Sequence, residues 1–248
     1  MGIHPVSGPS RYFRDQLDLL AQGEMGECRL VPQGSNYTFL TVLTNGDHQE
    51  CQAIYKPQRG EAPLWDFPDG TLYLREYATY LVSEALGWGF VPPTVIRDGK
   101  FGIGSVQIFV EADTSANYFT LFEAYRDEML RVCALDVVIN NADRKASHCL
   151  LGDDGRIWCI DHGVTFHDQH KLRTVIWDFA GEPVPELILK DLDGLLLGFD
   201  EADGIGGCLT PLLSRLEVDA VRRRVDGLLE SRTFPLPGLE RSVPWPWL

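Results

Sequence analysis

Hydrophobic and polar positions alternate over short stretches in the first part of the chain. Residues 28–31, 37–43 and 51–55 are rich in β-branched and aromatic side chains and are bounded by turn-forming residues. Asn45–Gly46 lies between the second and third stretches, and this dipeptide is typical of a tight turn. The pattern therefore predicts three short strands, the last of which leads into Lys56–Pro57.

The spacing changes over residues 71–86, where apolar side chains recur every three or four positions. This is the period of an α-helix with one buried face, and Gly87 is placed to end that helix. Two more stretches, residues 91–96 and 105–110, have the composition of strands and are joined by a glycine-rich turn.

The remainder of the chain is mainly helical in pattern. Residues 119–139 predict one long helix, helical spacing dominates after residue 184, and four prolines after Phe234 predict an extended tail. The order of strands, one helix, strands and then helices favours a two-lobed α+β fold with a cleft between the lobes. We expect a β-rich N-lobe over residues 1–112, a mainly helical C-lobe over 113–233 and the tail over 234–248.

A hairpin is the most informative local feature. Asp154–Gly155 predicts a two-residue type I′ turn, which needs positive φ at both positions. A hairpin centred there pairs Cys149 with Ile160 and, at its open end, His148 with Asp161. Opposed residues of an antiparallel pair have Cβ atoms about 4.5–5.5 Å apart, so this register brings an imidazole and a carboxylate together as a candidate metal site.

Asp143 lies five residues before His148, in a predicted loop. A carboxylate, a metal ligand five residues on, a hairpin and then an Asp before Gly form the layout of the catalytic loop in protein kinases. In that layout Asp143 accepts the proton of an acceptor hydroxyl, and His148 and Asp161 hold the metal. A capped polar hairpin end would give the same residues without chemistry.

Lys56 and Glu76 supply the other half of the predicted site. A lysine on a strand, paired with a glutamate on the following helix, holds an ammonium against the α- and β-phosphates in kinase folds. Lys56 ends a predicted strand and Glu76 lies in the first turns of the next helix, where Glu84 is a competing partner. An isolated lysine in this position would more often be a solvated strand end.

Two further segments are candidates for nucleotide binding through the main chain. Ser35 and Asn36, in the loop between the first strands, are placed to cover phosphates with their N–H groups. Gln107, Phe109 and Val110, in the segment that crosses between the lobes, are placed to contact an adenine edge. Neither segment has a Walker or G-x-G-x-x-G motif.

The composition of the chain limits the kinds of partner that we expect it to bind. The chain of 248 residues carries 36 acidic and 22 basic residues, a formal net charge of −14. Nucleic acid and anionic membranes both require a basic surface, so neither is an expected partner. No apolar run is long enough to cross a bilayer, and the first 30 residues have no apolar signal region, so we expect a cytoplasmic protein without membrane insertion.

The six cysteines contain no C-x-x-C pair, and a zinc site is therefore unsupported. Several lie in apolar runs, which favours buried, reduced thiols over disulfides.

These motifs resemble those of known kinases. Asp143-Arg-Lys-Ala-Ser-His148, followed by Ile160-Asp-His-Gly163, resembles the D-R-H-x-x-N and I-D-F-G pair of phosphoinositide kinases. The Lys56, Arg75–Glu76 and Val91-Pro-Pro93 segments are similar to type II phosphatidylinositol 4-kinases and secretory casein kinases, and HipA-type kinases share the same minimal plan. Runs such as Asn140-Asn-Ala-Asp-Arg-Lys145 are most similar to a bacterial family of short phosphoinositide-kinase-like proteins.

The resemblance implies an atypical kinase fold and an ATP-dependent phosphotransferase that uses Mg²⁺ or Mn²⁺, with a protein or small-molecule hydroxyl as acceptor. The chain departs from the motifs at three positions, with Lys145 for His, His148 for Asn and His162 for Phe. These departures leave two alternatives open, a nucleotide-binding pseudokinase and a nucleotidyl transferase on the same scaffold.

Overall fold

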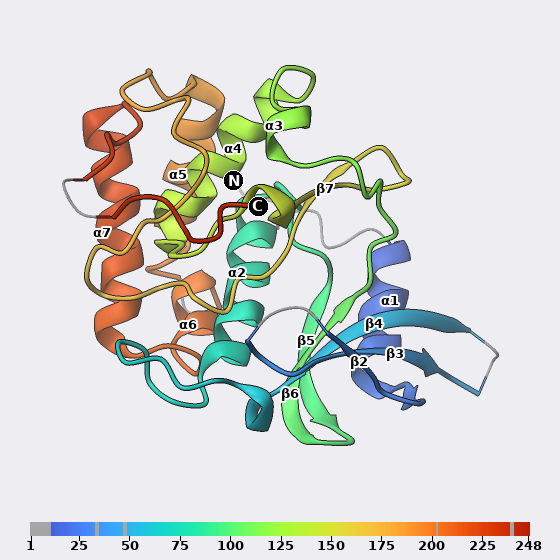
Figure 1. Cartoon of the computed structure of the whole chain (residues 1–248). Coiled ribbons are helices and arrows are strands. Elements are labelled where there is room, and N and C mark those ends of the chain that lie inside the picture. Colours follow the sequence, from blue (N-terminus) through green and yellow to red (C-terminus); the bar gives the residue numbers. More distant parts are fainter. Residues whose placement is uncertain (1–10, 33–34, 47–48, 202, 239–240) are drawn as a thin grey trace.

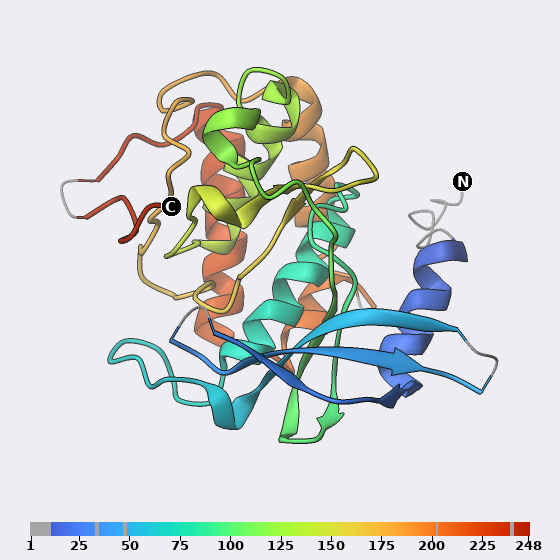
Figure 2. The same ribbon diagram turned by 45° about the vertical axis from the view of Figure 1, so that its right-hand side comes forward.

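The computed structural model of the protein describes residues 11–32, 35–46, 49–201, 203–238 and 241–248. A curled antiparallel sheet forms one part of the molecule and a mainly helical region forms the other, with helix α2 (Leu72–Ala85) between them (Figures 1 and 2). The predicted α+β class, with a β-rich part followed by a mainly helical part, is confirmed. Among the described helices, none is long and apolar enough to span a membrane.

The sheet follows the order β1-β3-β4-β6-β5, with β2 also paired to β3. Its strands are β1 (Glu24–Met25), β2 (Arg29–Val31), β3 (Thr38–Thr44), β4 (Glu50–Pro57), β5 (Thr94–Gly99) and β6 (Gly102–Ile108). The last two differ from the predicted 91–96 and 105–110. Pro92 and Pro93 have no N–H to donate, so β5 begins after them, and its tight turn into β6 is closed by Gly102 at φ +100°.

Helix α1 (Arg11–Gln22) was not predicted from the sequence. It packs on the sheet beside the N-terminal core, where Leu19 and Leu20 contact a cluster that includes Leu43, Tyr55 and Val106. Figure 2 shows it beside the strands, at the other end of the sheet from the loop that follows β4. The β-rich part therefore has a second helix besides the one predicted over residues 71–86.

The helical region contains α3 (Tyr118–Leu121), α4 (Arg126–Ile139), α5 (Glu186–Leu197), α6 (Ile205–Leu209) and α7 (Arg215–Ser231), and α2 spans Leu72–Ala85. The predicted single helix over 119–139 was wrong, because the chain turns between α3 and α4. Asn117 caps α3 through the Phe119 N–H, and Tyr125 leaves helical geometry with φ −122° and ψ 37°. The tail beyond Phe234 has no helix or strand among its described residues.

The predicted register of the hairpin was wrong by one residue. Strands β7 (Cys149–Leu151) and β8 (Ile157–Cys159) pair Cys149 with Cys159, not with Ile160. The turn has three residues rather than two. Gly155 alone in the turn has positive φ, at +74°, so a type I′ turn is excluded and the turn has the form of a type I turn followed by a left-handed glycine.

A buried ion pair fixes α2 to the helical region. Arg75 on α2 donates to Glu217 Oε1 on α7 at 2.6 Å and to the Thr165 carbonyl at 2.6 Å. The Arg75 side chain is 2% exposed and that of Glu217 10%. Because Glu76 follows Arg75 directly, this pair also determines where the Glu76 carboxylate lies.

Glu217→Gln is expected to lower the free energy of unfolding by about 3 kcal/mol, because it leaves the buried Arg75 guanidinium without a countercharge. Burial alone would raise the pKa of Glu217, but Arg75 and the hydrogen bonds from Ser214 lower it below its ordinary value. The carboxylate therefore stabilises the fold at neutral pH and loses this contribution as the pH falls below about 4. Chemical denaturation at pH 7 and at about pH 2.5, below the unfolded pKa of a glutamate, measures both effects.

Asp219→Asn is the matched control, because the Arg215–Asp219 pair on the same helix is exposed. Such pairs contribute at most about 1 kcal/mol. Equal losses in the two variants would show that Arg75 does not depend on Glu217.

Candidate active site

Lys56 on β4 and Glu76 on α2 form an ion pair, between Lys56 Nζ and Glu76 Oε1. Lys56 Nζ also lies 2.8 Å from Asp161 Oδ1, which follows the hairpin. The competing carboxylate, Glu84, lies about two helical turns further along α2, near Arg156, and burial raises its pKa. The structure thus brings Lys56, Glu76 and Asp161 together from three elements.

The charged groups of this cluster keep one another ionised. Burial alone would lower the pKa of Lys56, but Asp161 and Glu76 raise it above its ordinary value. The Lys56 ammonium in turn holds the pKa of Asp161 well below its usual range. Both groups are therefore charged at neutral pH, and each is available for a partner of opposite charge.

Glu76 connects the sheet to the segment that carries Asp161. Its Oε1 binds Lys56, while Oε2 accepts the His162 N–H at 3.0 Å. Glu76 is 4% exposed. A shift of α2 would therefore displace both the ammonium and the main chain next to Asp161.

Asp143 lies in the loop between α4 and η2 (Ala146–His148), as predicted. Its Oδ2 is 3.0 Å from Lys145 Nζ, and its N–H donates to Asn141 Oδ1 at 3.0 Å. Burial raises the pKa of Asp143 and the nearby Lys145 opposes that rise. A carboxylate with a raised pKa is a better proton acceptor than an ordinary surface carboxylate.

A buried network that the sequence did not reveal holds the Asp143 loop in shape. Asp136 on α4 accepts from Arg144 through Nη2 at 2.9 Å and through Nε, whose one N–H lies 3.1 Å from both carboxylate oxygens. It also accepts from Asn141 at 2.9 Å and from Thr174 at 3.2 Å. Arg144 and Asp136 are fully buried. Arg144 also contacts His162 Nε2 at 2.8 Å, which links this network to the segment next to Asp161.

Lys145 is a second residue whose role was missed, since the sequence marked it only as a departure from the kinase motif. It lines the same cleft as Lys56 and neutralises Asp143. Its position two residues after Asp143 could have indicated this role in the sequence, because that spacing keeps the Lys145 ammonium close to any group that the Asp143 carboxylate binds.

His148 and Asp161 lie close together although they are not opposed in the hairpin. The distance from His148 Nε2 to Asp161 Oδ2 is 3.5 Å. Asp161 has φ +63°, a left-handed conformation that Asp tolerates better than most residues, and this turn aims its carboxylate at both His148 and Lys56. The predicted proximity therefore arises from the bend at Asp161 and not from the register.

These two side chains suit a divalent cation that is also held by phosphates. Burial lowers the pKa of His148 to about 4, so its imidazole is neutral at neutral pH and has a free nitrogen lone pair. Neither ring nitrogen is committed, because both contacts, to Asp161 and to the Lys145 N–H, are long at 3.5 Å. No cluster of three or more protein ligands occurs among the described residues, so nucleotide oxygens and water would complete the coordination.

The loop residues Ser35 and Asn36 border the cleft, together with Lys56, Glu76, Asp143 and Asp161. Asn36 has a structural contact as well, since its Oδ1 accepts the Ala62 N–H at 2.7 Å. Gln33 and Gly34, in the same loop, lie outside the described residues. The cleft encloses about 140 Å³, space for a phosphate group beside Lys56 and Asp161 rather than for a whole nucleotide.

The three residues of the crossing segment lie apart from this cleft. Gln107 is within β6 and donates to Thr94 Oγ1 at 2.9 Å, and the Phe109 N–H donates to the Gln52 carbonyl at 3.0 Å. Over the described residues, Val110 is the member of the three whose main chain makes no hydrogen bond. Phe109 and Val110 line a separate pocket of about 410 Å³.

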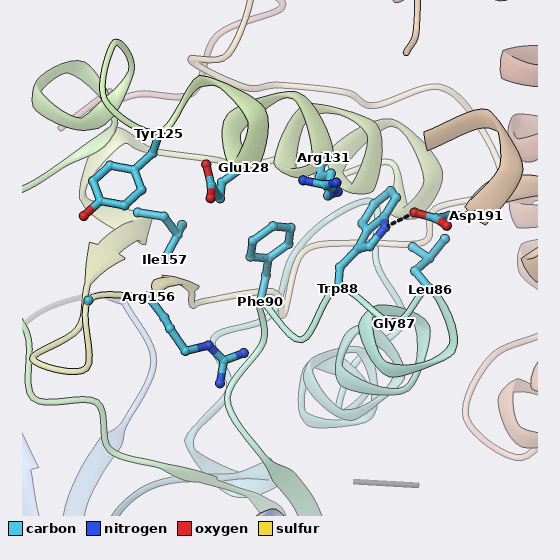
Figure 3. Close-up of a pocket in the computed structure, with 11 residues that line it drawn as sticks. Leu86, Gly87, Trp88, Phe90, Tyr125, Glu128, Arg131, Arg156, Ile157 and Asp191 are labelled. Carbon is cyan, nitrogen blue, oxygen red and sulfur yellow. Dashed lines mark hydrogen bonds between the residues drawn. The ribbon is translucent and has the colours of Figure 1, made fainter. Parts of the chain in front are cut away.

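A pocket of about 560 Å³ lies between the loop after α2, helix α4 and the β7–β8 turn (Figure 3). Glu128 and Arg156 project on opposite sides of Phe90, and Trp88 Nε1 donates to Asp191 Oδ2 at 2.8 Å (Figure 3). The pocket contains none of the predicted site residues, so we assign the chemistry to the smaller cleft at Lys56.

Replacing Lys56 is expected to weaken nucleotide binding far more than replacing Glu76. Lys56→Met removes a charge-assisted contact worth about 1.5–3 kcal/mol, and nucleotide affinity should fall roughly 10- to 100-fold. Glu76→Gln leaves the ammonium in place but loosely held, so the fall should be only a few fold. Titration calorimetry with a non-hydrolysable ATP analogue measures both.

Glu84→Gln is the control on the same helix, since Glu84 does not contact Lys56 in any described interaction. A larger loss of affinity in Glu84→Gln than in Glu76→Gln would contradict the pairing of Lys56 with Glu76.

Comparison with known proteins supports the same assignment. The family model for phosphatidylinositol 3- and 4-kinase matches residues 95–190, which include Asp143, His148 and Asp161. Protein Rv2133c of Mycobacterium tuberculosis is 39% identical over 271 residues, with 94% of this chain and 95% of that protein covered.

Two solved structures share the fold at low sequence identity. The Golgi casein kinase with Mn/ADP bound superimposes with a TM-score of 0.54 at 15% identity, over 90% of this chain and 76% of that one. The Helicobacter pylori proinflammatory kinase CtkA gives a TM-score of 0.52 at 12% identity, over 87% of this chain and 94% of that one. These likenesses confirm the atypical kinase-like fold expected from the sequence.

Proposed function

The chain belongs to the family of Protein Rv2133c, and its residues 95–190 match the family model for phosphatidylinositol 3- and 4-kinase; from this we propose that it transfers the γ-phosphoryl group of ATP to a hydroxyl acceptor. The observation that carries the proposal is the position of Lys56, which is paired with Glu76 from α2 and with Asp161 from the segment after the hairpin. A kinase needs this ammonium beside a metal-binding carboxylate, and a solvated strand-end lysine would have neither partner.

In this proposal the nucleotide phosphates replace Asp161 as the second partner of Lys56. Asp161 and His148 are the residues that would hold Mg²⁺ or Mn²⁺, and a cation bound there would supply charge stabilisation during transfer. The Mn/ADP that is bound in the Golgi casein kinase structure supports this choice of cofactors. An imidazole at His148 favours Mn²⁺ over Mg²⁺, which prefers oxygen ligands.

Asp143 receives the proton. The acceptor oxygen attacks the γ-phosphorus and forms a new P–O bond, the bond to the β-phosphate oxygen breaks, ADP leaves, and the hydroxyl proton moves to the Asp143 carboxylate. Lys145 lies 3.0 Å from Asp143 and can turn from that carboxylate to the phosphoryl oxygens. The two lysines then lie on the two sides of the group that is transferred.

The test is incubation with ATP labelled at the α- or at the γ-phosphate, with Mn²⁺ or Mg²⁺ and a mixture of protein and small-molecule acceptors. Transfer of the γ label alone is expected. Transfer of the α label would instead establish a nucleotidyl transferase, and nucleotide binding without transfer to any acceptor would establish a pseudokinase.

Nucleotide and metal together should raise the melting temperature of the protein. A ligand present at 100 times its dissociation constant stabilises the native state by about 2.7 kcal/mol, a shift of several degrees for a chain of this size. Mn²⁺ should be at least as effective as Mg²⁺ because of His148. No shift with millimolar ATP under either metal would contradict a nucleotide site.

A further inference from the structure

Two buried cysteines face each other at the open end of the hairpin. The register pairs Cys149 on β7 with Cys159 on β8, and both side chains are fully buried. The Ile160 N–H donates to the His148 carbonyl at 3.1 Å on one side of this pair. The Cys159 N–H points away from β7 and donates to the Phe90 carbonyl at 2.7 Å. Cys149 and Cys159 are therefore a non-hydrogen-bonded pair of the ladder.

This geometry is within the range that a disulfide requires. Opposed residues at such a position have Cα atoms about 4.5 Å apart, and disulfides span Cα separations of about 4.4–6.8 Å. The two residues are directly opposed in the ladder, so their side chains point to the same face of the hairpin. Both cysteines are free thiols in this structure, so the pair is in its reduced form.

The surroundings limit the oxidants that can reach the pair. Burial admits only a small oxidant, since no part of either side chain is at the surface. A separation at the short end of the allowed range makes the bond easier to reduce again.

We propose that Cys149 and Cys159 form a reversible disulfide when the folded protein meets hydrogen peroxide. One of the two sulfurs attacks one peroxide oxygen, an S–O bond forms, the O–O bond breaks, and the leaving hydroxide takes the thiol proton to become water. The other sulfur then attacks the sulfenic sulfur, the S–S bond forms and a second water leaves. The thiols lose two electrons and one peroxide is reduced to two waters.

The link would act on the candidate metal site. Cys149 directly follows His148, and Cys159 precedes Asp161 by two residues. Joining the strands here changes the twist of the hairpin where those two ligands leave it. This consequence rests on the proposed function, whereas formation of the bond does not, and we expect metal-dependent nucleotide affinity to fall several fold on oxidation.

The test uses the full chain with Cys28, Cys51 and Cys208, the three cysteines that are not fully buried, replaced by Ser. Peroxide should remove two hydrogens from the intact mass, peptide mapping should join residues 149 and 159, and dithiothreitol should reverse both changes. Cys149→Ser in that background should stop at a sulfenic acid on Cys159, which dimedone traps. If a variant fails to fold, peptide mapping of the oxidised wild-type chain tests the same link between residues 149 and 159.

A link from either residue to Cys133, or no link at peroxide concentrations that leave the protein folded, would overturn the proposal. Calorimetry with Mn²⁺ and an ATP analogue, before and after oxidation, tests the consequence. A mapped disulfide with unchanged affinity removes the coupling to the metal site. A mapped disulfide in a protein that never binds nucleotide rejects the proposed function and leaves the modification site standing.

Discussion

Asp143→Asn is expected to reduce turnover by roughly 10²- to 10⁴-fold, the usual contribution of a positioned general base, while ATP–metal affinity changes only a few fold. The physical reason is where Asp143 lies. Its carboxylate contacts Lys145 and its main-chain N–H donates to Asn141 Oδ1, whereas Asp161 is the carboxylate that contacts His148 and Lys56. Steady-state transfer of the γ label gives the turnover, and calorimetry with a non-hydrolysable analogue gives the affinity.

Asp153→Asn is the matched control for this substitution, because Asp153 is an exposed carboxylate in the turn of the hairpin. It should leave both quantities unchanged. The pH profile gives a further readout, because the pKa of Asp143 is raised in the folded protein. Wild-type turnover should fall as the pH drops below the raised pKa, and the residual turnover of Asp143→Asn should lack that limb.

The sequence predicted the elements that carry strong local signals. The helix that bears Glu76 has apolar positions at helical spacing, and the strands before it are separated by turn residues, so both were located to within a few residues. Helix α1 was missed, and residues 122–125 were assigned to a helix. Both errors arise where tertiary contacts decide the backbone, through the Leu19–Leu20 contact with the sheet and the cap at Asn117.

The candidate site was predictable where it depends on residue type and spacing. The Lys56–Glu76 pair and the proximity of His148 to Asp161 were both expected, and both contacts are present. The reason given for the second contact was wrong, since a sequence cannot distinguish a two-residue turn at Asp154–Gly155 from a three-residue one. A left-handed backbone at Asp161 compensates for the changed register.

The rest of the site depends on contacts between residues far apart in the chain. Arg75 and Glu217 are separated by 142 positions, and nothing local to either marks the pair. The partners of Asp136 could not be predicted either. A carboxylate in the middle of an apolar helix can be recognised in the sequence, but the sequence does not indicate that Arg144 and Thr174 bind it. Long-range ion pairs thus fix α2 and the Asp143 loop in ways that local patterns do not encode.

Asp161→Asn is expected to have the largest effect of all on function, because it removes a metal ligand and the charge that faces Lys56 together. Metal-dependent nucleotide affinity should fall roughly 10- to 100-fold, the equivalent of one charge-assisted contact, and turnover should fall by at least as much again. The amide preserves the shape of the side chain. Its effect on stability should be small, since the Asp161 side chain is 50% exposed and its ion pair is screened by water.

The decisive measurement compares affinity with and without divalent metal. With Mn²⁺, Asp161→Asn should bind the ATP analogue more weakly than the wild type. Without metal it should bind as well or better, because a carboxylate that repels phosphates and occupies Lys56 has been removed. Asp143→Asn should show no such reversal. If Asp143→Asn abolishes metal-dependent binding while Asp161→Asn retains it, the two carboxylates have exchanged roles and the kinase-like assignment of this cleft is wrong.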